Sequence, residues 1–123
     1  MRIVDSVGWI EHLSGGPLAA AYAPYLSDLA DLVTPTIVLY EVYKRTLQHS
    51  GLPAARAAAS LILKTTVVPL DEDLAAAAAE ASAEHGLAMA DAIIWATAQD
   101  FGATIVTSDA HFQGRPGVEY IPR

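Results

Sequence analysis

Apolar residues occur along this chain in two patterns, short continuous runs and longer segments with helical spacing. The short runs are rich in Val, Ile and Thr and are bounded by polar residues, proline or glycine, which is typical of strands. They predict strands at residues 2–5, 32–34, 65–68, 103–107 and 118–121, the last at an edge of the sheet. The longer segments predict helices at residues 6–13, 17–32, 36–50, 53–64, 71–85 and 87–101.

Some helix boundaries carry specific signals. Thr36 is expected to cap the helix that follows Pro35, and Gly51 to end it. Pro24 is expected to break or kink the helix at residues 17–32, because proline lacks a backbone N–H. Strands and helices alternate along the whole chain, so we predict an α/β fold. Its central sheet is mostly parallel, has four or five strands, and carries helices on both faces.

The helix at residues 87–101 is apolar on almost all sides, which predicts burial, yet it carries Asp91 near its start. A buried carboxylate costs free energy unless something pairs with it. Asp5 ends the first predicted strand, Asp109 follows the fourth, and Glu41 lies in the helix that follows the second. Ligands of open α/β sheets bind at the carboxyl ends of the strands, so we expect these four acids to meet at one edge.

Carboxylates that crowd together raise one another's pKa unless a cation joins them. Oxygen ligands favour hard ions such as Mg²⁺ and Mn²⁺, which activate water and stabilise phosphoryl transfer. Each acid also has a local explanation. The three aspartates are at positions that suit helix caps, and Glu41 is three and four residues before Lys44 and Arg45. Their joint placement at one edge favours a metal site.

Hydroxyl side chains stand next to two of these acids. Ser6 follows Asp5 and Thr107 precedes the SDAHF turn, so each either orients a carboxylate or water, or caps a local turn. His111 is close enough to Asp109 to act in support of the acids. The other histidines fall near helix ends, where favourable interaction with the helix dipole is a sufficient explanation.

The chain has 123 residues, of which 53% are hydrophobic, so we expect one packed domain, 1–123, with Trp9 and Trp95 in its core. No apolar run approaches the ~20 residues that a membrane helix requires. An acid at position 5 does not suit a signal peptide. We therefore expect a cytoplasmic protein without a membrane partner. The absence of cysteine excludes disulfides and thiolate metal sites.

The net charge is −7, with 14 acidic against 7 basic residues. This balance alone argues against a nucleic-acid-binding protein, which usually presents a basic face. Four acids that bind metal would leave −3 on the remainder of the chain. The acidity therefore weakens a nucleic-acid interpretation without excluding it, and it suits a basic partner equally well.

Two other enzyme classes share the strand–helix alternation. A haloacid-dehalogenase-like phosphatase requires an acid two residues after Asp5, where this chain has Val7. A response-regulator receiver requires paired acids near the N-terminus and a lysine late in the chain, whereas the only lysines are Lys44 and Lys64. Both interpretations fail on these residues.

Four stretches carry a more specific likeness: IVDSVGWIE, TPTIVLYEVYKR, ADAIIWATAQDFGATIVTSDAHF and the closing VEYIPR. With them, the chain resembles a PIN-domain ribonuclease over essentially its whole length, and in particular a VapC-type toxin of a bacterial toxin–antitoxin pair. The resemblance implies a PIN-like three-layer fold. The third stretch is the most informative, and a DS dipeptide alone would mean nothing.

The resemblance assigns metal-binding, catalytic roles to Asp5, Glu41, Asp91 and Asp109, with Thr107 helping to hold the acidic centre and Ser6 following the first acid as in the family. It implies Mg²⁺- or Mn²⁺-dependent endonucleolytic cleavage of RNA, with one or two ions among the carboxylates. It also implies a homodimer that is inhibited by a cognate, VapB-like antitoxin whose tail covers the site. Candidates for contacts with RNA phosphates are Lys44, Arg45 and Arg115.

Two departures from the family are visible: the first strand begins almost at Met1, and basic residues are scarce. The alternative from a different functional class is a catalytically inactive PIN-like domain that binds a protein partner and cuts nothing. The four intact acids argue against it. The alanine-rich apolar helices suit protein–protein contact under either hypothesis.

Overall fold

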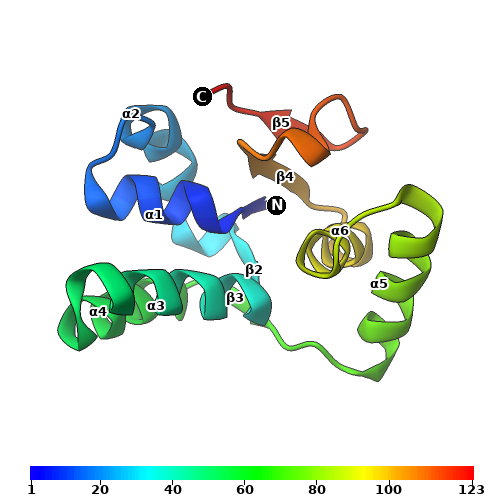
Figure 1. Ribbon diagram of the computed structural model, residues 1–123, viewed down its shortest axis with the longest axis horizontal. Coiled ribbons are helices and arrows are strands. Elements are labelled where there is room, and N and C mark those ends of the chain that lie inside the picture. Colours follow the sequence, from blue (N-terminus) through cyan, green and yellow to red (C-terminus); the bar gives the residue numbers. More distant parts are fainter.

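The computed structural model describes residues 1–123 as alternating strands and helices (Figure 1). The strands are β1 (Arg2–Val4), β2 (Val33–Pro35), β3 (Thr66–Val68), β4 (Thr104–Thr107) and β5 (Val118–Tyr120). The α-helices are α1 (Ser6–Ser14), α2 (Ala19–Tyr22), α3 (Thr36–Ser50), α4 (Leu52–Ile62), α5 (Glu72–His85) and α6 (Met89–Phe101). Short 3₁₀ turns span Ala23–Leu26, Leu29–Asp31 and Ala110–Phe112. The element types and most boundaries agree with the prediction to within one or two residues.

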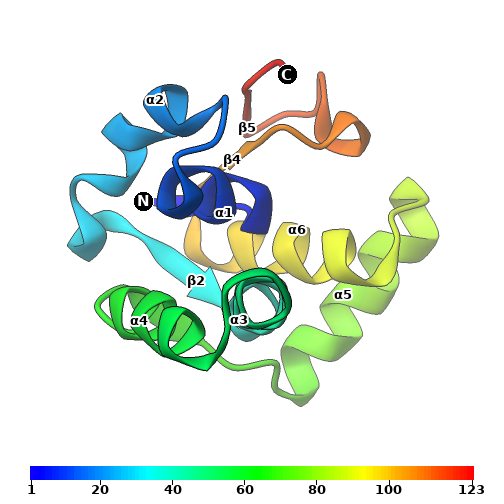
Figure 2. The ribbon, with the colours of Figure 1, turned by 60° about the vertical axis from the view of Figure 1, so that its left-hand side comes forward.

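All five strands are parallel to their neighbours. They form a three-stranded ladder, β1-β4-β5, and a two-stranded ladder, β2-β3. A single parallel bridge between Arg2 and Leu32 joins the ladders, so the order across the molecule is β3-β2-β1-β4-β5. Helices cover both faces (Figures 1 and 2). The predicted α/β fold with a parallel sheet is confirmed, and β5 is the edge strand as expected.

The segment between α1 and β2 differs from the prediction of one long, broken helix. Only Ala19–Tyr22 is α-helical, and two 3₁₀ turns follow it. Pro24 accounts for the change, because it cannot donate an α-helical hydrogen bond and lies at the start of the first turn. The predicted cap by Thr36 is also wrong. Thr36 is the first residue of α3, Pro35 precedes it, and no side chain caps this end.

Helix α6 is the centre of the core. Eight consecutive residues from Asp91 to Ala98 are buried, as the apolar pattern predicted. The helix packs against β1, β2 and β4 on one side and against α5 on another. Trp9 and Trp95 are both buried, as expected. No helix of the structure is both long enough and apolar enough to cross a lipid bilayer.

Helix α1 approaches the segment after it very closely at Gly8. A Cβ atom built on Gly8 would lie 2.6 Å from Cγ1 of Val4 and 2.6 Å from Cδ1 of the Tyr22 ring, where real Cβ atoms are essentially never found. Tyr22 is fully buried at this contact. The absence of a side chain at Gly8 is therefore what lets the aromatic ring lie against α1.

Candidate functional site

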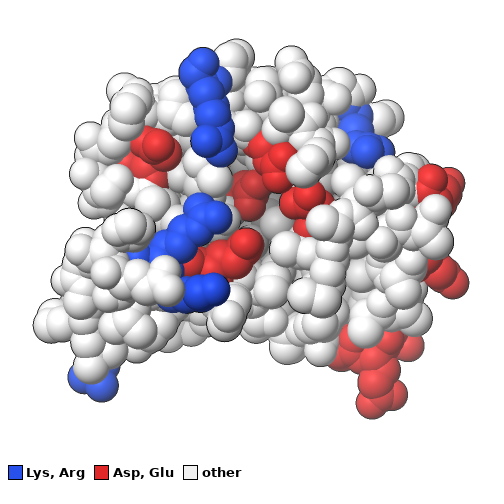
Figure 3. Space-filling model, viewed as in Figure 1, with Lys and Arg blue, Asp and Glu red and all other residues white.

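The carboxyl ends of β1 and β4, together with the N-terminal halves of α3 and α6, surround an open cavity of about 630 Å³. All four acids predicted from the sequence, Asp5, Glu41, Asp91 and Asp109, line it. Figure 3 shows acidic groups gathered in a hollow of this face, with basic groups at its margin. The prediction that the four acids meet at one edge of the sheet is confirmed, since all four line this cavity.

Asp5 is held at the junction of β1 and α1 by two hydrogen bonds. One carboxylate oxygen accepts from the backbone N–H of Ser6 at 2.6 Å, and the other accepts from the Thr107 hydroxyl at 2.8 Å. Thr107 Oγ1 in turn accepts from the backbone N–H of Asp109 at 3.0 Å. Asp5 thus does cap α1, as its local explanation required. The cap also orients its carboxylate at the cavity, so the two interpretations do not compete.

Asp109 has a similar double role at the end of β4. It is the N-cap of the 3₁₀ turn Ala110–Phe112, and its Oδ1 accepts from the backbone N–H of His111 at 2.9 Å. Asp91 caps nothing, because α6 begins at Met89 with Ala88 as its N-cap. The local explanation therefore fails for Asp91.

His111 takes a larger part in the site than its sequence position indicated. Its Nδ1 lies 3.1 Å from Oδ1 of Asp109 and 3.4 Å from Oδ2 of Asp91. One ligand atom from each of these three residues lies within 4.8 Å of the others, so they could share a metal ion. Asp5 and Glu41 line the same cavity without belonging to this closest group. The sequence predicted a metal site with oxygen ligands only. The structure adds an imidazole nitrogen of His111 as a further ligand candidate.

Glu41 projects from α3 and is half-buried. No ion pair joins it to Lys44 or Arg45, so helical pairing does not explain its position. Burial raises the pKa of Glu41, the Asp5 carboxylate raises it further, and Arg45 partly offsets both effects. The nearby Ser6 side chain lowers the pKa of Glu41 and so favours its charged form.

The other acids are pushed in the same direction. Burial raises the pKa of Asp5, although hydrogen bonds from Thr107 and Ser6 oppose the rise. Burial, followed by the neighbouring Asp109 and Asp5 carboxylates, raises the pKa of Asp91 to about 6. These carboxyl groups resist ionisation because they are buried together in one cavity. A cation bound among them would lower their pKa values.

Of the three predicted basic residues, only Arg45 lines the cavity. Lys44 does not, and its Nζ lies over the Tyr40 ring at 5.9 Å. Arg115 binds backbone, since its Nε donates to the His111 carbonyl at 2.8 Å and its Nη2 to the His85 carbonyl at 3.3 Å. Arg123, which sequence reasoning missed, lines the cavity from the C-terminal end of the chain.

Ser108 was also missed by sequence reasoning. It is buried between Thr107 and Asp109 and lines the cavity. Its hydroxyl shares a 2.6 Å hydrogen bond with the Tyr22 hydroxyl, 86 positions away. The TSD sequence places Ser108 among the acids, but nothing local indicates its partner. The pair ties the loop after β4 to the segment after α1.

The raised carboxyl pKa values predict that the metal-free protein loses stability as pH rises from about 4 to about 6. In this range the folded protein holds a proton on Asp91 that the unfolded chain has released, so the free energy of unfolding falls with increasing pH. The expected contribution is on the order of 2 kcal/mol. Urea unfolding in EDTA across this range measures it. Asp91→Asn should reduce the dependence of the free energy of unfolding on pH, and the exposed Asp28→Asn should leave it unchanged. If Asp91→Asn showed the same pH dependence as the wild type, Asp91 would not be the group responsible.

Comparison with known families gives a match to the model described as PIN domain over residues 2–117. Among curated proteins there is no match. A toxin–antitoxin complex from Klebsiella pneumoniae contains a similar structure, with a TM-score of 0.81 and 24% identity, covering 98% of this chain and 100% of that one. VapC20 of Mycobacterium tuberculosis, described as a sarcin–ricin loop cleaving toxin, has a TM-score of 0.80 and 25% identity, covering 99% and 100%.

A third similar structure is VapBC2 from Rickettsia felis, solved bound to a DNA fragment from its promoter. Its TM-score is 0.75 and its identity 17%, and the alignment covers 97% of each chain. The similarities extend over nearly the whole of this chain and nearly the whole of each matched chain. The fold is therefore shared along its full length.

Proposed function

This chain belongs to the PIN domain family, and from that premise we propose that it is a metal-dependent endoribonuclease, the toxin of a VapBC-type toxin–antitoxin pair. The observation that carries the proposal is the convergence of Asp5, Glu41, Asp91 and Asp109 on one cavity. The similarity to VapC20 supports RNA as the substrate class.

The residues of the cavity fit a divalent metal. Carboxylate oxygens are the ligands that Mg²⁺ and Mn²⁺ prefer. Burial, together with the neighbouring carboxylates, raises the pKa of Asp5, Glu41 and Asp91, and a bound cation would oppose that rise. We propose the four acids as the catalytic metal-binding set, with His111 as an additional ligand candidate beside Asp91 and Asp109. One or two bound ions would lower the pKa of an attacking water and offset charge developing on the phosphate.

The chain's own contribution is to hold these groups in position before substrate binds. The Thr107 hydroxyl donates to Asp5 and accepts from the Asp109 amide, so one side chain sets the relative placement of two acids on different elements. The backbone N–H of Ser6 donates to the other oxygen of the Asp5 carboxylate. Such fixed hydrogen bonds reduce the reorganisation that the reaction would otherwise require.

Two arginines at the cavity suit contacts with the RNA backbone. Arg45 and Arg123 line it together with the acids, whereas Lys44 lies outside it and Arg115 is bound to two backbone carbonyls. Guanidinium groups bind phosphates with paired hydrogen bonds. We therefore propose Arg45 and Arg123 as the phosphate contacts.

Replacing either arginine should weaken RNA binding at all sequences and reduce its dependence on salt. Arg45→Gln and Arg123→Gln should each lower affinity several-fold and decrease the salt slope by about 0.7, the value expected for one contact with single-stranded RNA. Fluorescence anisotropy with labelled RNA, measured in an Asp5→Asn background to prevent cleavage, provides both quantities. Arg56→Gln, on the exposed side of α4, is the matched control. Equal losses in all three variants would indicate general charge effects.

A second cavity supports binding of the antitoxin. It measures about 440 Å³, lies between α1, α3 and α4, and has apolar walls that include Ile10, Leu13 and Leu61. Arg45 lines both this cavity and the acidic one, so the two are adjacent. We propose that a VapB-like antitoxin places an apolar segment here and extends over the acids, which would block access of RNA.

Exposed apolar side chains support a homodimer. On α3, Tyr40 is 59% and Leu47 is 41% exposed, and they line a shallow apolar groove with Leu39 and Tyr43. Met89, at the start of α6, is 73% exposed. Groups of this kind on a surface mark sites of protein association. We propose that a second copy of the chain covers the α3 groove.

The test of the proposed function is cleavage of total cellular RNA by the purified protein in the presence of Mn²⁺. We expect discrete fragments that disappear with EDTA and with Asp5→Asn, whereas Asp28→Asn, at an exposed position outside the cavity, cleaves normally. Activity that survives EDTA would reject the metal-dependent mechanism. Absence of cleavage at every metal concentration, in protein free of antitoxin, would favour the non-catalytic interaction domain instead.

A further inference from the structure

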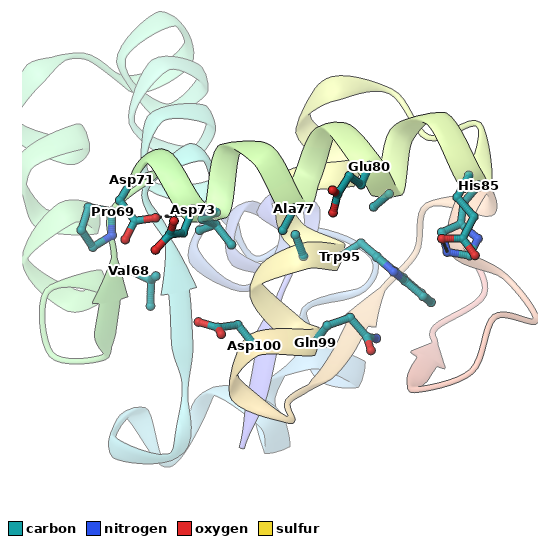
Figure 4. Close-up of a pocket in the computed structure, with 14 residues that line it drawn as sticks. Val68, Pro69, Asp71, Asp73, Ala77, Glu80, His85, Trp95, Gln99 and Asp100 are labelled. Carbon is teal, nitrogen blue, oxygen red and sulfur yellow. Dashed lines mark hydrogen bonds and ion pairs between the residues drawn. The ribbon is translucent and has the colours of Figure 1, made fainter.

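A separate groove lies between α5 and α6 and shares no lining residue with the acidic cavity (Figure 4). Its volume is about 700 Å³. Small apolar side chains and one indole form its floor: Leu74, Ala77, Ala81, Trp95 and Ala96. The proposed nuclease function makes no use of it.

The walls of the groove are acidic. They carry Asp71, Asp73, Glu80 and Glu84 from α5 and the turn before it, and Asp100 from α6. No Lys or Arg occurs between residues 65 and 114. Among these five acids only Glu84 approaches a basic group, His85 Nε2 at 3.9 Å. By contrast, Asp31 and Glu119 each lie within 4.0 Å of an Arg2 side-chain nitrogen.

Helix stability does not explain all of these charges. Asp73 lies in the first turn of α5, where the helix dipole favours an acid, and Asp71 caps that helix. Glu84 and Asp100 lie in the last turns of α5 and α6, where a negative charge is disfavoured. Their presence at the groove costs helix stability, which points to a role outside the fold.

Trp95 offers a binding group at the floor. Its side chain lies in the groove beside that of His85 (Figure 4), with ring centroids 5.3 Å apart. Trp95 is only 9% exposed, yet its indole N–H makes no hydrogen bond and is not among the fully enclosed polar atoms. A nearly buried indole that lines an acidic groove suits a cationic ligand, because the acids attract the ligand and the face of the indole ring binds its positive charge.

We propose that the α5–α6 groove binds an amphipathic, Lys- and Arg-rich helix of a partner protein. The positions 73, 77, 80 and 84 form one stripe along α5, with small Ala77 leaving room between the acids. Helix α5 has 14 residues and is thus about 21 Å long, which sets a similar length for the partner helix. The charge of the walls excludes nucleic acid as the occupant.

The probe is a labelled 14-residue amphipathic helix of Ala, Leu and Lys, with the same peptide carrying Glu in place of Lys as its counterpart. Fluorescence anisotropy with the full chain should detect binding of the Lys peptide only. Its affinity should fall as ionic strength rises from about 0.01 M to about 0.15 M, because the screening length shortens from about 30 to about 8 Å. Equal binding of the two peptides would overturn the proposal.

The location is tested with two double variants of equal charge change. Glu80→Gln/Asp100→Asn removes one acid from each wall and should weaken binding of the Lys peptide about tenfold at low salt. Asp28→Asn/Glu119→Gln removes two acids on other elements outside the groove and should change it by less than about twofold. Equal losses in both variants, or a comparable loss in Asp91→Asn, would place the peptide elsewhere and overturn the proposal. No readout here depends on nuclease activity.

Discussion

Asp91→Asn is expected to abolish RNA cleavage and, at the same time, to make the metal-free protein more stable at neutral pH. The activity loss follows from removing a proposed metal ligand, and should reach about 10³-fold, equivalent to about 4 kcal/mol of transition-state stabilisation. The stability gain follows from the raised pKa, because the folded protein must ionise Asp91 among other carboxylates. An amide of the same shape avoids that cost, on the order of 2 kcal/mol.

The opposite signs make this prediction specific. Cleavage of labelled RNA in Mn²⁺ measures the first effect, and urea unfolding in EDTA at pH 7.5 measures the second. Asp28→Asn, at an exposed aspartate that does not line the cavity, should change neither. A variant that lost activity and stability together would indicate a structural role for Asp91 in place of the proposed one.

Gly8→Ala is expected to destabilise the protein severely, although alanine is the better helix former. In an exposed helix this change would stabilise by about 1 kcal/mol. Here the new Cβ would overlap both Val4 and the Tyr22 ring, neither of which has room to move, and overpacking of this kind costs about 3 kcal/mol or more. Displacing Tyr22 would also break its hydrogen bond with Ser108, beside the acids.

The measurement is chemical unfolding of Gly8→Ala compared with wild type. Tyr22→Leu removes the ring against which the added methyl group would press, so the double variant Gly8→Ala/Tyr22→Leu should lose less stability than the sum of the two single changes. Additive losses would show that Gly8 and Tyr22 are not coupled. Unchanged stability in Gly8→Ala would contradict the close packing of α1 against this segment.

The fold followed from the sequence because its signals are local. Apolar runs bounded by proline or glycine mark the strands, and Gly15, Gly86 and Gly102 each end a helix in the left-handed conformation that glycine adopts most readily. The prediction failed between α1 and β2, where Pro24 divides an apolar, helix-like pattern into short turns. There the apolar spacing was helical, but the backbone lacked a necessary hydrogen-bond donor.

The shared edge of Asp5, Asp91 and Asp109 could be predicted from the sequence, because the backbone ties each acid to the end of a strand or the start of a helix. Which other side chains join them depends on tertiary packing. His111 contacts Asp91 across 20 positions of sequence, and Arg123 reaches the cavity while Arg115 does not. Such contacts depend on how loops and long side chains pack against distant elements, and that information is absent from local periodicity.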